Sequence, residues 1–297
     1  MLRVEDLDTP RCQLGAEARQ LADLRWLGLD WDEGPDCGGP YGPYRQSQRL
    51  SRYEAALREL EERGLVYLCD CSRSEIARAA SAPHAGDEGP RYPGLCRGFG
   101  MRQRAFKRSP AVRLLVPEEP VLVEDGLQGR LQENVSATVG DFVLRRGDGV
   151  FAYQLAVVVD DLAMHISEVV RGVDLLTSAA RQTLLARLLS AQAPRYAHHA
   201  LVVDAGGERL AKRAASLSIA ALRNRGLRAG QVNAGLARAL GLVGRDCDAC
   251  SPQELLGIFD RTGLAGRTTA HVPSFEASSA WPGPAQDDGP AKARGPV

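Results

Sequence analysis

The chain carries three cysteines whose spacing could bind a metal ion. Cys69 and Cys71 are separated by one residue, and Cys96 follows Tyr92 after a long intervening stretch. Three thiolates and one oxygen or nitrogen ligand would complete a tetrahedral structural zinc site. The pattern predicts one zinc ion, with Tyr92 as the fourth ligand. A tyrosine ligand is unusual, so His84 or a water molecule is an alternative fourth ligand. The other interpretation is that these are three unrelated buried cysteines that bind no metal.

The cysteine content as a whole indicates reduced thiols. Seven is an odd number, which favours free thiols and metal binding over a disulfide framework. Cys247 and Cys250 have CxxC spacing, but no second pair lies nearby, so we interpret them as ordinary thiols. No apolar stretch approaches about 18 residues, and the first residues are not a signal peptide. We therefore expect a cytoplasmic protein with no membrane partner.

A basic stretch follows the cysteines. Formal charge is balanced at 37 against 37, so any attraction to nucleic acid must come from a local patch. Residues 97–113 contain no acidic residue and interleave cations with two aromatic rings: Arg97, Arg102, Arg104, Lys107, Arg108, Arg113, Phe99 and Phe106. Such a stretch could contact RNA phosphates and unstacked bases, or it could be a solvated loop flanking the metal site.

Apolar periodicity predicts the elements of the first half of the chain. The spacing predicts helices over residues 16–27 and 45–63, the second ending at Gly64. Residues 65–68 are typical of a short strand that leads into the cysteine pair. Further strands are expected between residues 110 and 123 and over 142–145, and residues 81–94 read as a loop.

The second half is less regular. Residues 151–159 form a short apolar run that could be a helix or a buried strand. Residues 166–170 are typical of a strand, and Thr177 is predicted to cap a helix that runs to about Leu189. The tail from residue 277 has little apolar surface to bury and is expected to be disordered.

Several segments resemble one family, the glutamyl-Q tRNA(Asp) synthetases, which are short relatives of glutamyl-tRNA synthetases. The resemblance covers roughly residues 2–240, in family order. Its segments are LRVEDLDTPR at 2–11, GPYRQSQRLSRYEAALRELEERGLVYLCDCSR at 42–73, YPGLCR at 92–97, FAYQLAVVVDD at 151–161, VVRGVDLL at 169–176 and ERLAKR at 208–213.

The resemblance implies an α/β fold: a class I synthetase Rossmann-like catalytic domain with an inserted, zinc-containing subdomain that binds the tRNA acceptor. The expected parts are residues 1–67 and 141–240 for the catalytic domain, 68–140 for the insertion, 241–276 for a C-terminal helical segment and 277–297 for a disordered tail. The family's first strand and its HIGH helix are expected to be missing before residue 1, through a start assigned too late or a truncated or decayed copy.

The resemblance also implies residue roles. Glu5 resembles the carboxylate that holds the α-amino group of substrate glutamate, and Tyr153 resembles a substrate-contacting tyrosine. Arg171 resembles the arginine that receives the side-chain carboxylate, for which a bidentate guanidinium is well suited. Without the motifs, Glu5 and Arg171 would be interpreted as members of ordinary ion pairs and Tyr153 as a packing wedge.

ERLAKR stands where the family carries its KMSKS-type loop. By position, Lys212 is the catalytic, ATP-binding lysine that stabilises the phosphates as pyrophosphate leaves. The motif departs from the family at Arg209, which keeps a positive charge, and at Ala211, which removes a hydroxyl.

The implied activity is ATP-dependent activation of L-glutamate, with Mg²⁺ accompanying ATP, and transfer to the queuosine base of tRNA(Asp). An ordinary glutamyl-tRNA synthetase would continue into an anticodon-binding domain, whereas this chain has little sequence after Lys212. We expect a monomer. The alternative is an inactive paralogue that acts as a zinc-containing RNA-binding module.

Overall fold

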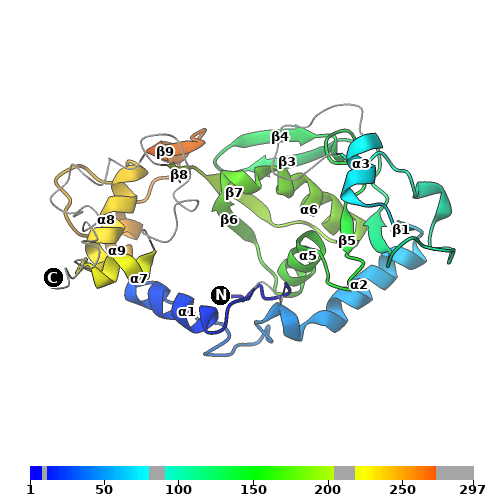
Figure 1. The fold of residues 1–297 in the computed structure, drawn as a ribbon. Coiled ribbons are helices and arrows are strands. Elements are labelled where there is room, and N and C mark those ends of the chain that lie inside the picture. Colours follow the sequence, from blue (N-terminus) through cyan, green and yellow to red (C-terminus); the bar gives the residue numbers. More distant parts are fainter. Residues whose placement is uncertain (9–11, 80–90, 204–217, 272–297) are drawn as a thin grey trace, which may run out of the picture. The chain divides into compact units, whose positions relative to one another are not determined.

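The computed structural model describes residues 1–8, 12–79, 91–203 and 218–271 (Figure 1). The chain divides into two compact units. The first comprises Met1–Glu17 and Trp31–His199, and the second comprises Ala18–Asp30 and Ala200–Val297. All the predicted site residues that the structure describes lie in the first unit.

Two sheets form the first unit. An antiparallel sheet has the strand order β1 (Val66–Cys69), β2 (Ala111–Leu114) and β5 (Val143–Arg145). A mixed sheet has the order β4 (Gly129–Glu133), β3 (Val121–Asp125), β7 (Arg195–His199) and β6 (Glu168–Gly172). Strands β3, β7 and β6 run parallel, and β4 runs antiparallel to β3. Three parallel strands therefore bring their carboxyl ends to one edge of the mixed sheet.

Helices of the first unit bury the apolar side chains of these sheets. They are α2 (Leu50–Glu62), α3 (Arg73–Ala79), α4 (Val135–Thr138), α5 (Tyr153–Ala163) and α6 (Leu176–Leu188), and α6 connects β6 to β7 (Figure 1). Helices α2 and α5 pack together, as do α5 and α6, and α6 also packs against β3. Leu60, Leu155 and Leu185 are fully buried in the resulting core.

A buried carboxylate ties α2 to α5. Asp160 of α5 has no exposed surface, and its oxygens accept hydrogen bonds from Arg49 Nε at 2.5 Å, Gln46 Nε2 at 2.9 Å and the Tyr53 hydroxyl at 2.8 Å. The neighbouring Asp161 accepts from Arg3 Nη1 at 2.7 Å. These two carboxylates therefore anchor both α2 and the N-terminal segment onto α5.

We expect Asp160→Ala to lower the free energy of unfolding by about 3–5 kcal/mol, because it leaves the buried Arg49 guanidinium without its carboxylate partner. Urea denaturation measures the loss. The matched control is Glu59→Ala, which breaks an exposed pair with Arg63 and should cost less than about 1 kcal/mol. Equal effects of the two substitutions would contradict the anchoring role of Asp160.

The second unit is mainly helical. It holds most of α1 (Ala16–Trp26) together with α7 (Ile219–Asn224), α8 (Ala229–Ala239) and α9 (Pro252–Ile258). A parallel two-stranded sheet pairs β8 (Leu201–Val203) with β9 (Thr269–His271). The expected C-terminal helical segment, 241–276, therefore contains a strand as well as α9. The predicted tail, 277–297, lies outside the described residues.

The helices of the structure can be compared with those predicted from the sequence. The predicted helices over 16–27 and 45–63 are confirmed as α1 and α2, although residues 46–48 form a separate 3₁₀ turn. The ambiguous run 151–159 leads into a helix, α5. Thr177 as a helix cap is wrong: the 3₁₀ turn Val173–Leu175 continues directly into α6, which begins at Leu176 with Thr177 inside it.

Two further expectations are affected by the fold. The bounds of the insertion, 68–140, stay a prediction, but β3 and β4 from that range belong to the same sheet as β6 and β7. Part of the predicted loop 81–94 lies outside the described residues. Within the described residues, no helix combines the length and the apolar composition needed to cross a membrane.

Candidate active site and metal centre

Arg171 lies near the carboxyl end of β6, directly opposite His198 of β7. Its Nε donates a hydrogen bond to Nε2 of His198 at 2.9 Å, and its Nη2 donates to the carbonyl oxygen of Leu175 at 3.2 Å. The guanidinium also lies 5.2 Å from the centre of the Tyr196 ring. Within the described residues, no carboxylate forms an ion pair with Arg171. The arginine is thus held in place while its positive charge is not neutralised.

His198 is in turn held by Asp125, the last residue of β3. Nδ1 of His198 lies 2.5 Å from an Asp125 carboxylate oxygen, and both side chains are buried. The other Asp125 oxygen accepts from the backbone N–H groups of Leu127, Gln128 and His198 at 2.8–3.1 Å. Burial raises the pKa of Asp125, but these hydrogen bonds outweigh it, so the net pKa lies below the ordinary value. Burial lowers the pKa of His198, and the positive charge of Arg171 acts in the same direction.

Glu5 and Tyr153 lie in the same region as Arg171. Burial raises the pKa of Tyr153, the negative charge of Glu5 raises it further, and the positive charge of Arg171 opposes them. The Tyr153 phenol is therefore within electrostatic range of both charged residues. Glu5 also accepts a hydrogen bond from Arg3 at 3.0 Å. The three predicted substrate residues are thus electrostatically coupled, and one of them, Arg171, lies near the carboxyl end of a parallel strand, where α/β sheets commonly bind their ligands.

Lys212 lies outside the described residues, as do Arg209 and Ala211. Its catalytic and ATP-binding role stays a prediction from the ERLAKR motif.

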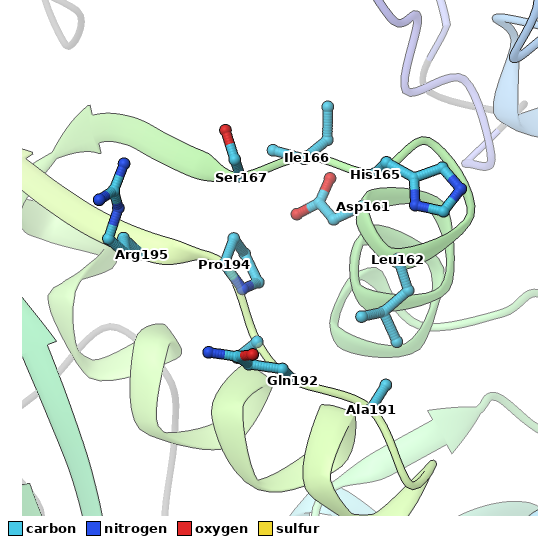
Figure 2. Close-up of a pocket in the computed structure, with 10 residues that line it drawn as sticks. Asp161, Leu162, His165, Ile166, Ser167, Ala191, Gln192, Pro194 and Arg195 are labelled. Carbon is cyan, nitrogen blue, oxygen red and sulfur yellow. The ribbon is translucent and has the colours of Figure 1, made fainter.

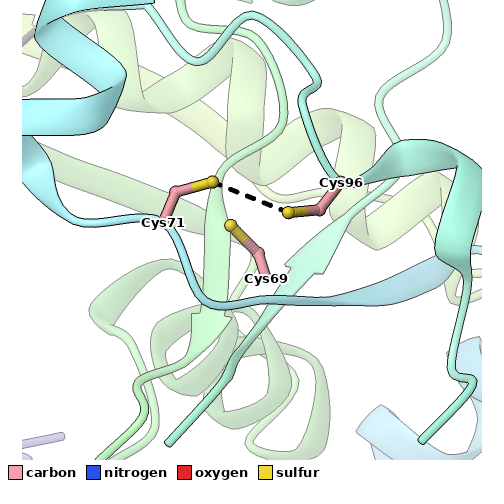
Figure 3. Close-up of side chains that lie close together, drawn as sticks. All are labelled: Cys69, Cys71 and Cys96. Atoms are coloured by element: carbon pink, nitrogen blue, oxygen red, sulfur yellow. Dashed lines mark hydrogen bonds between the residues drawn. The ribbon is translucent and has the colours of Figure 1, made fainter. Parts of the chain in front are cut away.

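Cys69, Cys71 and Cys96 come together in the first unit (Figure 3). Their three sulfur atoms lie within 4.8 Å of one another, and Sγ of Cys71 is 3.6 Å from Sγ of Cys96. Sulfurs that share a tetrahedral zinc ion at about 2.3 Å are about 3.8 Å apart. The three thiols are therefore close to the separation that a zinc ion requires.

Tyr92 contacts all three of these cysteines. Its hydroxyl oxygen lies 3.2 Å from Sγ of Cys69 and 3.8 Å from Sγ of Cys71, and it accepts the backbone N–H of Cys96 at 3.0 Å. Burial raises the pKa of Tyr92 above its ordinary value. Burial also raises the pKa of Cys71 to about 12, whereas hydrogen bonds from Tyr92, the Cys71 backbone and Arg113 overcome burial at Cys69 and lower its pKa. His84, the other candidate ligand, lies outside the described residues.

Asp70 ties the cysteine loop to the basic stretch. Its carboxylate pairs with Arg104 at 2.7 Å and accepts the backbone N–H of Lys107 at 2.9 Å. The hydrogen bond from Arg104 is the main reason that the pKa of Asp70 falls to about 2. The Arg104 guanidinium lies over the rings of Phe99 and Phe106, at 4.6 and 4.7 Å from their centres. The two aromatic rings that could have stacked on bases therefore contact an arginine of the same loop.

Four other cations of the stretch also have partners. Arg97 pairs with Asp141 at 2.5 Å, and Lys107 and Arg108 pair with Glu75 at 2.8 and 3.6 Å. Arg113 is buried and donates to the backbone carbonyl of Asp141. The structure therefore favours the second interpretation of residues 97–113, a loop that flanks the cysteine cluster.

A hollow of about 540 Å³ lies elsewhere in the first unit (Figure 2). Asp161, His165, Gln192 and Arg195 line it, together with the residues that precede β6 and β7. It is thus at the amino ends of these strands, opposite the edge at which Arg171 lies. Because ligands of parallel sheets bind beyond the carboxyl ends, this hollow is not the predicted substrate site.

Asp125 and His198 were not predicted from the sequence. Each lies in a short strand, and nothing in its local pattern distinguishes it from a packing residue. The available signal was indirect: a histidine near the end of a strand close to the ERLAKR motif, and an acidic residue at the end of another. Only the pairing of β3, β7 and β6 brings them to Arg171.

Comparison with known proteins gives one consistent result. Residues 1–272 match the family described as tRNA synthetases class I (E and Q), catalytic domain. The chain is 48% identical over 271 residues to a glutamyl-Q tRNA(Asp) synthetase of Nitratidesulfovibrio vulgaris, covering 90% of this chain and 83% of that protein. It is 47% identical over 264 residues to the protein of the same description from Nocardia farcinica, covering 88% and 78%.

A solved structure agrees in fold. The crystal structure of glutamate-tRNA synthetase from Elizabethkingia anophelis matches with a TM-score of 0.75 and 25% identity, over 92% of this chain. The chain spans 61% of the length of that synthetase.

The fold, with its three parallel strands and a charged site at their carboxyl ends, is that of a class I aminoacyl-tRNA synthetase catalytic domain, and the chain is a ligase of this kind. Within that class, the chain belongs to the glutamyl-Q tRNA(Asp) synthetase family. The resemblance in the motifs and the predicted class I fold are therefore confirmed.

Proposed function

We propose that the protein activates L-glutamate with ATP and transfers it to the queuosine base of tRNA(Asp). The observation that carries the proposal is the arginine at the end of β6: Arg171 is fixed by His198 and Leu175, and no carboxylate among the described residues neutralises it. A positive charge kept in place without a partner is prepared for an anionic ligand.

The charges around this arginine fit an amino acid with an acidic side chain. Arg171 would receive the γ-carboxylate of glutamate, and the Glu5 carboxylate would hold its α-ammonium group. Tyr153 is 38% exposed and lies within electrostatic range of both, so it would contact the substrate between them. Glutamine offers no negative charge to Arg171, so we expect the site to prefer the acid.

The first chemical step is attack of an α-carboxylate oxygen of glutamate on the α-phosphorus of ATP, with departure of pyrophosphate. Lys212 would stabilise the negative charge that moves onto the leaving phosphates, and Mg²⁺ would accompany ATP. The activated carbonyl is then attacked by a hydroxyl group of queuosine, and AMP leaves. The three substrate residues contribute mainly by positioning the glutamate.

We also propose that Cys69, Cys71, Cys96 and Tyr92 bind one structural zinc ion. The distances among their sulfur and oxygen atoms support this assignment, because a zinc-bound oxygen and sulfur would lie about 3.5 Å apart. Zinc would replace the thiol protons and hold the β1 end, the loop after it and the 3₁₀ turn Arg97–Phe99 together.

Radiolabelled glutamate and two preparations of tRNA(Asp), with and without queuosine, test the proposed function. The protein as its own cell produces it should label only the queuosine-containing tRNA. Labelling should persist when the terminal adenosine of the tRNA is removed, because the acceptor is a base in the anticodon. Labelling of tRNA(Glu) that requires the terminal adenosine would instead indicate an ordinary glutamate-tRNA ligase.

A further inference from the structure

A chain of hydrogen bonds crosses three neighbouring strands and ends at Arg171. Asp125 of β3 lies 2.5 Å from Nδ1 of His198 on β7, and Nε2 of His198 lies 2.9 Å from Nε of Arg171 on β6. His198 and Arg171 are paired residues of parallel strands, so their side chains lie on one face of the sheet. Asp125 pairs with Tyr196, two residues before His198, and therefore faces the same way.

The chemistry of the three side chains fixes the position of the proton. A guanidinium group has only hydrogen-bond donors, so Nε2 of His198 must carry the lone pair that accepts from Arg171. The imidazole proton is then on Nδ1 and is donated to the Asp125 carboxylate. A neutral His198 with the proton on Nδ1 is the only form that satisfies both contacts, because either other form would direct an N–H at the Arg171 Nε–H.

This chain of hydrogen bonds also fixes the orientation of the Arg171 guanidinium. The bond to His198 occupies Nε, the bond to Leu175 occupies Nη2, and the guanidinium carbon lies over the Tyr196 ring. The His198 ring is itself stacked on Tyr196, with centres 5.9 Å apart and planes 21° from parallel. Among the described residues, Nη1 has no hydrogen-bond partner.

We propose that Asp125 and His198 are positioning residues that orient the Arg171 guanidinium toward the substrate carboxylate by enforcing the Nδ1–H tautomer. This proposal rests on the proposed function of Arg171. Asp125 acts at a distance: its carboxylate, fixed by backbone N–H groups of the turn after β3, determines which imidazole nitrogen can accept from Arg171.

Two substitutions at His198 separate this role from a purely structural one. The amide of glutamine reaches about as far as Nε2 of histidine, so His198→Gln can accept from Arg171 but loses Asp125. The amide of asparagine reaches about as far as Nδ1, so His198→Asn keeps Asp125 but loses Arg171. We expect KM for glutamate within about threefold of wild type for His198→Gln, and a rise of about ten- to a hundredfold for His198→Asn.

The matched controls are His199→Gln and His199→Asn. The neighbouring residue of β7 faces the other side of the sheet, so both should leave KM unchanged. Thermal unfolding curves for every variant show whether the fold is retained. The proposal would be overturned if KM for glutamate stayed at the wild-type value in His198→Asn and rose in His198→Gln. That result would mean that glutamate binding depends on the contact between residue 198 and Asp125 and not on the contact with Arg171.

Asp125→Asn tests the tautomer directly. The amide of the new asparagine can donate to Nδ1 of His198, which leaves the imidazole proton on Nε2. The Nε2–H then points at the Nε–H of Arg171, and the hydrogen bond between the two residues is lost. We expect ¹⁵N NMR of the imidazole to report Nδ1–H in the wild type and Nε2–H in Asp125→Asn, with a KM increase of about tenfold or more and a kcat changed less than about threefold.

The two proposals fail in different ways. Nε2–H in the wild-type His198, or an unchanged KM in Asp125→Asn with the tautomer switched, would overturn the positioning role. Failure of the wild type to use glutamate would overturn the proposed function, and the ¹⁵N spectrum would still decide whether the three side chains form the hydrogen-bonded chain.

Discussion

Replacing Arg171 with alanine should lower kcat/KM for glutamate by about 10²- to 10³-fold, because the γ-carboxylate would enter the site without its charge partner. Arg171→Lys should fall between alanine and the wild type, since it keeps the charge but not the fork of parallel donors. Pyrophosphate exchange that depends on glutamate measures both variants. The ratio of glutamate to glutamine activation should also fall in Arg171→Ala, because the preference for the acid would be lost.

Arg195→Ala is the matched control. Arg195 begins β7, pairs in register with Glu168 at the other end of β6, and is exposed. Like Arg171→Ala, Arg195→Ala removes one positive charge from the mixed sheet, but at the amino ends of the parallel strands. We therefore expect kcat/KM for glutamate to change by less than about threefold. Similar losses for Arg171→Ala and Arg195→Ala would mean that net charge, rather than a specific contact, accounts for the effect, and the assignment of Arg171 would be wrong.

Metal analysis of freshly purified, unchelated protein should find about one zinc ion per chain. Cys96→Ser should lose most of this zinc and unfold at a temperature lower by about 10 °C, because the metal holds together segments that are distant in sequence. A strong chelator should shift the wild type in the same direction. The protein should regain its unfolding temperature when zinc is returned.

Cys12→Ser is the control for the metal centre, because Cys12 is a free, exposed cysteine outside the cluster. It should retain both the zinc and the unfolding temperature. Tyr92→Phe tests the fourth ligand: a large loss of zinc would support ligation by the phenol oxygen, and full zinc content would assign the fourth position to another donor. Wild-type protein without zinc would contradict the metal site altogether.

The parts of the site that could be predicted were those written in contiguous motifs. Cys69 and Cys71 are separated by one residue, and this short spacing indicates that they bind the same metal ion. The structure brings Cys96 next to them. Tyr153 and Arg171 were found through motifs, and the structure places them within electrostatic range of each other. Their substrate roles stay predictions.

The parts that could not be predicted depend on long-range pairing. Asp125 and His198 are 73 residues apart in the sequence, and no local sequence pattern predicts that parallel strands bring them together. The basic stretch shows the reverse problem: from its composition it resembled an RNA-contacting surface, but Asp70, Glu75 and Asp141 pair with most of its charges. Thr177 has the right residue type for a helix cap, yet the preceding 3₁₀ turn already begins the helix.

The anchoring of the N-terminal segment on α5 has a consequence for synthesis on the ribosome. Arg3 is made before its partner Asp161, which lies 158 residues later in the chain. At about 5–20 residues per second, the segment that carries Glu5 waits roughly ten to thirty seconds for the carboxylate that fixes it. His198 is made later still. The proposed substrate site therefore cannot assemble in a nascent chain until His198 has been translated, and a ribosome stalled before that point would carry a chain that is not expected to bind glutamate.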